Sequence, residues 1–310
     1  MITAPVRDKA WGEAWQGGDV EPEEGPESVG DGRVVVAVDA EDTPWCSTGV
    51  ELVSDRLFSL GASAVSELAG DGGRLRLVAD LPARALDRLD GPYEVLEHDP
   101  SWNDAWRDHA TAVAVGDRLL LRPEWVTADP ADAGRVEIVL DATHAFGSGS
   151  HPTTRLCLEV LEGLGAELAG ARVLDVGSGT GVLGVAALVL GAGSLVAVDV
   201  DPAAVAATGR TAELNGVSDR AVEVSSRPVA EVTADHGPFD VVLANLLIPI
   251  IETLGPELAA AVAPGGHLVL SGLLADPSLG QADRALAAVG ANFGASNELD
   301  RDGWAAVVAV

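Results

Sequence analysis

The sequence has very few basic residues. Lysine and arginine together number 19 against 48 aspartates and glutamates, which gives a formal net charge of −29 at pH 7, and Lys9 is the only lysine. Because a chain this acidic repels phosphate backbones, direct nucleic-acid binding is not expected. The same charge favours a basic protein partner. Adaptation to salt, or simple solubility, is the alternative explanation of this composition.

Cysteines and long apolar runs are also scarce. Cys46 and Cys157 lie far apart and lack the spacing of a metal site, so we expect no metal centre and two reduced thiols. No uncharged apolar run reaches the roughly 18 residues of a membrane helix, so no membrane association is expected. Residues 1–11 carry three charges and no apolar segment, so no secretory signal is expected. The expected location is therefore the cytoplasm.

The hydrophobic pattern divides the chain into four parts. Residues 1–32 are rich in Gly, Glu, Asp and Pro and are expected to form an acidic loop or a disordered segment. Residues 33–98 show short elements in the order β-α-β-β-α-β, which predicts a small ferredoxin-like α+β domain. Residues 99–135, with three tryptophans, are expected to be a linker region. In residues 136–310 strands alternate with helices, which predicts an α/β domain with a parallel sheet covered on both faces.

The apolar periodicity of this last part predicts individual elements. Strands are expected at Val173–Val176, Leu195–Val198, Ala221–Val224, Val241–Ala244, His267–Leu270 and Ala305–Val310. Helices are expected at Val182–Leu190, Pro202–Asn215, Ile248–Val262 and Pro277–Val289. In such a sheet, ligands bind at the carboxyl ends of the parallel strands.

A glycine-rich turn follows the first of these strands. Asp175 precedes the pattern Gly-Ser-Gly-Thr-Gly at 177–181, where bare backbone and a helix N-terminus can receive a ligand. A dinucleotide fingerprint counted from Gly177 would need glycine at position 182, which is valine. Asp199 ends the next strand, where an acid can bind two ribose hydroxyls. This layout favours S-adenosylmethionine (SAM) over a nicotinamide cofactor. It makes Asp175, Gly177, Gly179 and Asp199 candidate cofactor-binding residues.

Two further features are expected at the same edge of the sheet. Asn245 ends an apolar strand, where it either caps a turn or accepts a hydrogen bond from an incoming amine; we favour the second, catalytic role. A helix is expected to begin near Pro152, and its free N–H groups and threonine hydroxyls can receive the carboxylate of the methionine moiety. We interpret His151 as a helix cap or structural hydrogen-bonding group rather than a base.

Several motifs together resemble one family. They are Phe-Gly-Ser-Gly-Ser-His-Pro-Thr-Thr at 146–154, Leu-Asp-Val-Gly-Ser-Gly-Thr-Gly at 174–181, Asp-Val-Asp-Pro at 199–202 and Ala-Asn-Leu-Leu at 244–247. The chain resembles the PrmA family, which methylates amino groups of ribosomal protein L11, over about residues 99–310. Residues 33–98 match it only in architecture. The chain departs from the family pattern at 142–144 and at 247–249.

The resemblance has implications for fold, site and partner. It implies a Rossmann-like class I SAM methyltransferase domain with a seven-stranded, mostly parallel sheet, whose last strand closes an antiparallel edge. It implies cofactor contacts from Thr154, Gly177, Asp199 and Asn245. It also implies that the small N-terminal domain recognises the protein substrate, most simply ribosomal protein L11. Methylation of another protein or of a small amine, and SAM binding without chemistry, are the competing interpretations.

Overall fold

In the computed structural model the chain forms two compact units, Met1–His109 and Ala110–Val310. The structure describes residues 33–39, 53, 56–57, 60, 62, 65–69, 75–89, 91–96, 111–141, 151–290, 293 and 296–310. Residues 1–32, interpreted above as a loop or disordered segment, lie outside this described part.

The first unit contains a four-stranded antiparallel sheet. Its elements are β1 (Arg33–Asp39), β2 (Val65–Ala69), β3 (Leu75–Pro82), the 3-10 helix η4 (Ala83–Arg88) and β4 (Glu94–Leu96). The strand order is β2-β3-β1-β4, and every neighbouring pair is antiparallel. Most of the segment between β1 and β2 lies outside the described residues, so the ferredoxin-like assignment stays a prediction.

The second unit begins earlier than the sequence pattern indicated. Strands β5 (Val113–Val115), β6 (Leu119–Pro123) and β7 (Val136–Leu140), with the 3-10 helix η6 (Pro130–Asp132), form a three-stranded sheet within it. Residues 111–135 are therefore part of this unit and not of a linker. The physical reason is burial, because the side chains of Leu119, Leu121 and Ile138 are fully buried in its hydrophobic core.

The main sheet of this unit has seven strands among the described residues. They are β8 (Arg172–Val176), β9 (Ser194–Val198), β10 (Ala221–Ser225), β11 (Phe239–Asn245), β12 (Val262–Leu274), β13 (Ser296–Arg301) and β14 (Trp304–Ala309). The order is β10-β9-β8-β11-β12-β14-β13, with the first five strands parallel and β14 antiparallel to both of its neighbours. This confirms the predicted α/β class with a mostly parallel sheet.

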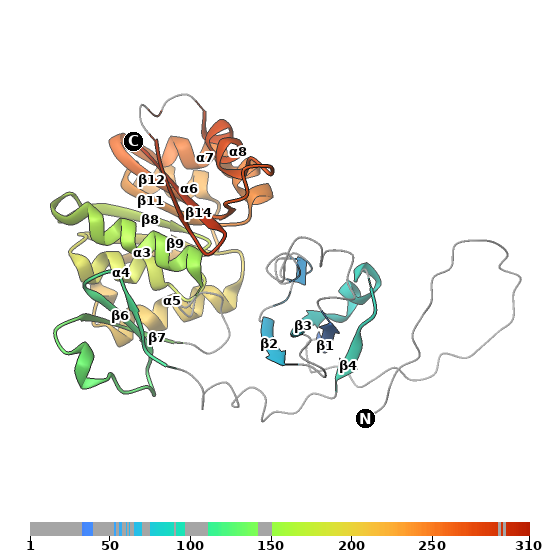
Figure 1. The fold of residues 1–310 in the computed structure, drawn as a ribbon. Helices are drawn as coiled ribbons and strands as arrows, with labels where there is room; N and C mark the ends of the chain where they lie inside the picture. Colours follow the sequence, from blue (N-terminus) through green and yellow to red (C-terminus); the bar gives the residue numbers. More distant parts are fainter. Residues whose placement is uncertain are drawn as a thin grey trace, which may run out of the picture. The chain divides into compact units, whose positions relative to one another are not determined.

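Helices cover both faces of this sheet (Figure 1). They are α3 (Pro152–Leu164), α4 (Val182–Leu190), α5 (Pro202–Leu214), α6 (Val229–His236), α7 (Ile248–Ala261) and α8 (Gln281–Val289), with short 3-10 turns η7 (Gly165–Leu168) and η8 (Ser218–Arg220). None of the helices in the described part of the chain is long and apolar enough to cross a membrane.

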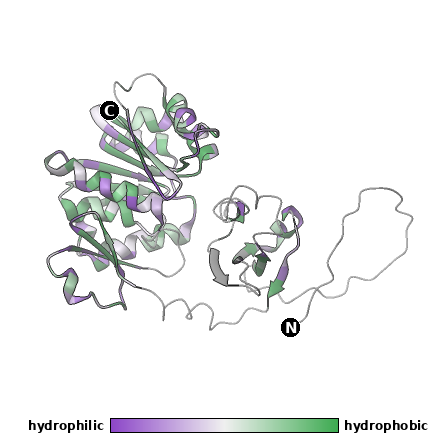
Figure 2. Cartoon of the chain, in the orientation of Figure 1, coloured by the Kyte–Doolittle hydropathy of each residue, from purple (hydrophilic) through white to green (hydrophobic). Residues whose placement is uncertain are grey.

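Alternation along the strands separates two hydrophobic cores. In β8, Val173 faces one core with α3 and α4, whereas Leu174 faces the other with α6, α7 and α8. Because neighbouring strand side chains point to opposite faces, a strand buried on both sides is apolar at nearly every position. The central strands and the apolar helix α4 accordingly carry the hydrophobic colour in Figure 2.

The antiparallel edge differs from the expectation. The predicted final strand, β14, is not at the edge but lies between β12 and β13. Residues Trp304–Ala306 are buried, as suits an inner strand, whereas Asn297, Glu298 and Asp300 of β13 are exposed. The polar composition of β13 hides it from a search for apolar runs, and the same applies to α6, which the sequence analysis also missed.

Helix α5 is fastened to β7 by one side chain. Asn215, which follows α5, donates from Nδ2 to the carbonyl oxygens of Val139 (2.7 Å) and Thr211 (2.8 Å). Its Oδ1 accepts from the Val139 N–H at 2.9 Å. Asn215 thus pairs with both backbone groups of one β7 residue, as a neighbouring strand would. This attachment fixes where α5 crosses the unit.

Candidate active site

Three parallel strands end at the same level. In the central sheet, Val176 of β8 pairs with Val198 of β9 on one side and with Ala244 of β11 on the other. The residues that directly follow these three are Gly177, Asp199 and Asn245. The structure therefore brings these predicted site residues together at the carboxyl edge of the sheet, where the direction of strand order reverses.

The loop after β8 needs its glycines. Gly177, Gly179 and Gly181 have φ values of 72°, 55° and 79°, in the left-handed region that side chains disfavour. A Cβ on Gly177 would come within 2.4 Å of Leu246 Cδ2, and one on Gly181 within 2.8 Å of the Thr208 Cα. The loop is thus a close backbone approach that leads directly into the N-terminus of α4.

Asp199 is fixed at the end of β9 by its own backbone contacts. Its Oδ2 accepts from the Gly179 N–H and its Oδ1 from the Asp201 N–H, both at 2.9 Å. The Asp199 N–H donates to the carbonyl of Ser225 at 3.1 Å. A carboxylate has about four acceptor sites, and two are used here, so capacity remains for the hydroxyls of a ligand. The half-buried carboxylate is thereby oriented before any ligand arrives.

Asp175 occupies a different environment from Asp199. Only 1% of the residue is exposed, and its Oδ2 accepts from the Gly184 N–H in the first turn of α4 at 2.9 Å. Burial raises the pKa of Asp175 to about 7, against the lowering effect of the Gly184 hydrogen bond and with a smaller raising effect of the Asp199 charge. Asp175 was a candidate cofactor ligand. In the structure this carboxylate is buried and bonded to Gly184 of α4, and its role as a cofactor ligand stays a prediction.

A pH dependence of folding stability follows from this burial. A carboxyl whose pKa is about 7 when folded and about 3.9 when unfolded stabilises the fold most below pH 4 and loses that contribution as pH rises to 7. The side chain in Asp175→Asn stays neutral, so the variant lacks this pH-dependent contribution to stability. Its stability relative to the parent should therefore improve by about 1–3 kcal/mol between pH 5 and pH 8. Urea unfolding of both proteins at the two pH values measures this; a difference that stays constant would contradict the assignment.

The start of α3 lies over the same region of the sheet. Ser271 of β12 is the register partner of Asn245, and its hydroxyl lies 3.4 Å from the carbonyl oxygen of Thr153 and 3.1 Å from that of Ala305. His151 caps the helix, with Nδ1 accepting from the Thr153 N–H, as the interpretation as a cap predicted. Thr154 is 1% exposed, and its Oγ1 has no hydrogen-bond partner among the described residues. Residues 146–150 of the same motif lie outside the described part.

Asn245 ends β11 with a partly exposed side chain. The next residue is held firmly: the Leu246 N–H donates to the Ser271 carbonyl at 3.0 Å, and the Leu246 side chain lies against Gly177. Two residues further on, α7 begins, with Pro249 in its first turn. The backbone on both sides of Asn245 is thus fixed, which is what an orienting side chain requires.

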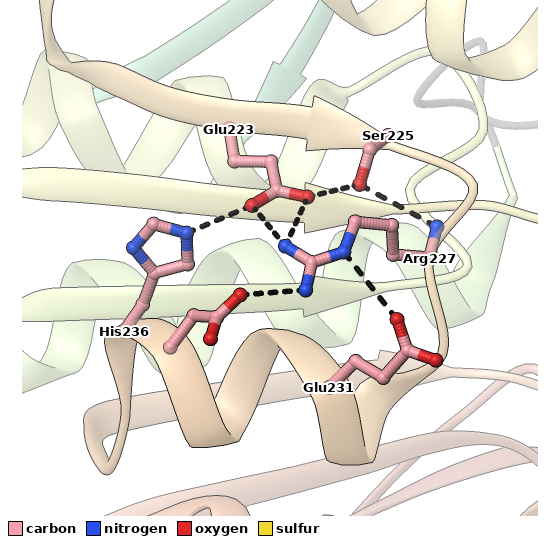
Figure 3. Close-up of polar contacts among 6 residues, drawn as sticks. Glu223, Ser225, Arg227, Glu231 and His236 are labelled. Carbon is pink, nitrogen blue, oxygen red and sulfur yellow. Dashed lines mark hydrogen bonds and ion pairs between the residues drawn. The ribbon is translucent and has the colours of Figure 1, made fainter.

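A polar network joins the edge strand β10 to helix α6 (Figure 3). The hydroxyl of Ser225 and the ring Nε2 of His236 both contact the carboxylate of Glu223. The hydrogen bond from Ser225, with further contributions from His236 and Arg227, holds the pKa of Glu223 below its ordinary value. Arg227 contacts three carboxylates, those of Glu223, Glu231 and Asp235. This network fastens α6 to the end of β10, whose Ser225 carbonyl anchors Asp199.

Two residues on other elements shape the glycine loop and were not among the predicted site residues. Thr208 of α5 is fully buried and contacts Ser178 and Gly179, and Leu246 packs on Gly177. Thr208 lies outside every motif named above, whereas Leu246 lies within the motif at 244–247. The signal in the sequence that could have indicated Thr208 is a threonine in the middle of a helix, at a buried position where an apolar residue is usual.

This geometry suits an adenosyl ligand. The glycines leave a cradle that side chains would fill, Asp199 offers unused acceptor sites at the end of β9, and Thr154 presents a buried hydroxyl without a partner among the described residues. The residues present therefore fit SAM.

Comparison with known proteins agrees with this geometry. The family model for "Ribosomal protein L11 methyltransferase (PrmA)" matches residues 83–310. The chain belongs to the PrmA family. The resemblance drawn from the sequence motifs is thereby confirmed, and the match extends further toward the N-terminus than the motifs indicated.

Individual PrmA relatives show the extent of the similarity. The ribosomal protein L11 methyltransferase of Bordetella parapertussis is 44% identical over 305 residues, covering 86% of this chain and 93% of its own length. That of Geobacter sulfurreducens is 44% identical over 188 residues, covering 61% of this chain and 60% of its own length. The chain thus spans less than two thirds of the length of some of the relatives that it matches. A crystal structure of ribosomal protein L11 methylase from Lactobacillus delbrueckii subsp. bulgaricus has a TM-score of 0.56 and 29% identity, covering 64% of this chain and 98% of that one.

Proposed function

We propose that this protein is a SAM-dependent methyltransferase that transfers methyl groups to amino groups, lysine side chains and the N-terminal amine, of ribosomal protein L11. One observation carries the proposal. In a member of the PrmA family, the glycine loop fixed by Asp199 and the strand-end amide of Asn245 follow aligned residues of the sheet. A cofactor in the loop and an amine at Asn245 would therefore lie side by side.

The binding residues divide between the parts of the cofactor. Asp199 would accept hydrogen bonds from the ribose hydroxyls, and the backbone at Gly177 and Gly179 would lie against the ligand. Thr154, at the start of α3, would receive the carboxylate of the methionine moiety near the positive end of the helix dipole. When bound, SAM supplies a methyl group already activated by its sulfonium charge.

Placement is then the main task of the protein. The Asn245 amide oxygen would accept a hydrogen bond from the target amine and aim the nitrogen lone pair at the methyl carbon. A reacting distance of about 3–3.5 Å with the orbitals in line accounts for a large part of the rate enhancement in such reactions. The amine must be neutral, and burial next to a positive sulfonium favours loss of its proton. We assign no general base.

The partner is proposed from charge and family. With a net charge of −29, the surface would attract a basic protein and repel nucleic acid, and the attraction would weaken with salt. We propose that residues 33–98 recognise the protein substrate and that methylation takes place in the cytoplasm, before the substrate is assembled into the ribosome.

The proposal is tested with purified ribosomal protein L11 and methyl-labelled SAM. We expect label on L11 and mass increments in steps of one methyl group, located by peptide mass spectrometry on lysines or the N-terminal amine. A lysate from a strain lacking the gene serves as a second substrate. Label on a different protein there would correct the substrate, and SAM binding without any label would indicate a binding protein without catalysis.

Removal of the first unit separates cofactor binding from substrate recognition. A truncated protein that begins at Ala110 retains both hydrophobic cores of the second unit and all the proposed cofactor contacts. It should bind SAM with the parent affinity but lose most L11 methylation, because nothing would hold the protein substrate in reach. Calorimetry and the label assay measure the two effects. Methylation of L11 at the parent rate would show that the first unit has no role in recognition.

A further inference from the structure

The Ser178–Gly179 segment of the glycine loop is held by a side chain from outside the loop. Thr208 lies in α5 with 0% exposure, and its Oγ1 is 3.2 Å from the Gly179 carbonyl oxygen and 2.9 Å from Ser178 Oγ. A threonine hydroxyl has one proton. Since the Gly179 carbonyl can only accept, Thr208 donates to it, and Ser178 therefore donates to Thr208. The result is a directed chain of two hydrogen bonds from Ser178 through Thr208 to Gly179.

Gly179 is consequently fixed on both sides. Its N–H donates to Asp199 from the β9 end, and its carbonyl accepts from Thr208 of α5. The two peptide planes that flank Gly179 thus have set orientations. The φ of this residue is 55°, and a glycine in a free chain also adopts many other φ values. The backbone of Thr208 also lies against Gly181, where even a methyl group would collide with it.

We infer that Thr208 is a positioning residue for the cofactor: its hydroxyl sets the glycine loop in the conformation that receives SAM. The inference rests on the proposed function of this site. Thr208 holds the carbonyl of Gly179, and Asp199 holds its N–H. The Asp199 carboxylate therefore does not have to hold the loop alone while it binds a ligand. An ordered loop lowers the entropy lost on binding, which appears as higher affinity rather than faster chemistry.

The decisive substitution is Thr208→Val in the full chain. Valine keeps the branched shape and volume of threonine but removes the hydroxyl, which leaves the Gly179 carbonyl and the Ser178 hydroxyl without this partner. We expect the Kd for SAM, measured by calorimetry, to rise about 5- to 10-fold, while kcat at saturating SAM stays within about twofold. Thr208→Ser restores a hydroxyl and should bring the Kd back to within about twofold of the parent.

Thr211→Val is the matched control. Thr211 is equally buried and one turn further along α5, but its hydroxyl accepts from the Asp141 N–H, and within the described part of the chain no hydrogen bond joins it to the glycine loop. The control should lose folding stability, as we also expect for Thr208→Val, yet bind SAM with the parent Kd. If both valine variants raise the Kd by the same factor, or if neither does, the inference is overturned.

A ligand-free measurement distinguishes failure of this inference from failure of the proposed function. Amide hydrogen exchange over residues 177–181 should be faster in Thr208→Val than in the parent, and unchanged in Thr211→Val. A parent protein that does not bind SAM would refute the proposed cofactor, whereas equal exchange in the parent and Thr208→Val would refute the role of Thr208.

Discussion

Replacing Asn245 with alanine is expected to lower kcat about 100-fold while the Kd for SAM changes by less than about threefold. Asn245 lies at the end of β11 between fixed backbone segments, so its amide can hold an amine in one orientation. Without it, the amine would still reach the site but would lose alignment with the methyl group. A contact made in the transition state lowers kcat and kcat/KM together, which initial rates with varied L11 concentration will show.

Two further variants sharpen this experiment. Asn245→Asp keeps an acceptor oxygen and should retain more turnover than the alanine variant if the acceptor is what orients the amine. Asn297→Ala removes an asparagine from the exposed strand β13 and should leave turnover unchanged. Parent-level turnover in Asn245→Ala would show that this residue serves only the turn.

Asp199→Ala is expected to weaken SAM binding by about 10- to 100-fold. Hydrogen bonds to a charged group contribute about 1.5–3 kcal/mol each, and the variant would lose those that we propose to the ribose hydroxyls. It also frees the Gly179 N–H, which the carboxylate now holds at 2.9 Å, so part of the loss comes from the loop. Calorimetry gives the affinity, and circular dichroism checks that the fold is intact.

The control for Asp199 lies at the opposite edge of the sheet. The carboxylate of Asp240 accepts from the Arg172 N–H at 2.8 Å, so it makes the same kind of backbone contact far from the site. Asp240→Ala should lose some stability but keep the parent affinity for SAM. An unchanged Kd in Asp199→Ala would remove this residue from the site, and tight NADH binding in the parent protein would favour a dehydrogenase.

The local parts of the site could be predicted from the sequence. The glycine loop and the helix Val182–Leu190 that follows it are encoded within a few residues, and the structure has the helix at the expected bounds. The aligned ends of β8, β9 and β11 follow from three apolar runs in a parallel sheet. The cap role of His151 follows from its place directly before Pro152.

Elements with weak apolar patterns could not be predicted in this way. The strand β13 and the helix α6 were not predicted, because exposed edge strands and surface helices need few buried side chains. Residues 99–135 were predicted to be a linker, although Leu119 and Leu121 complete the core around α3 and α4. Short apolar runs do not reveal which sheet they will join.

The sequence by itself determined the family, the cofactor class and the strand ends that carry Gly177, Asp199 and Asn245, because these depend on motifs whose residues are near neighbours in the chain. Only the tertiary structure separated the environments of two acids that look alike in sequence: Asp175 is buried under α4 and accepts from Gly184, whereas Asp199 is half-buried at the carboxyl ends of the strands. Only the tertiary structure, too, brought Thr208 to Gly179. That contact depends on how α5 packs beside the loop. Packing brings together residues that are far apart in the chain, and a local sequence pattern does not predict such pairs.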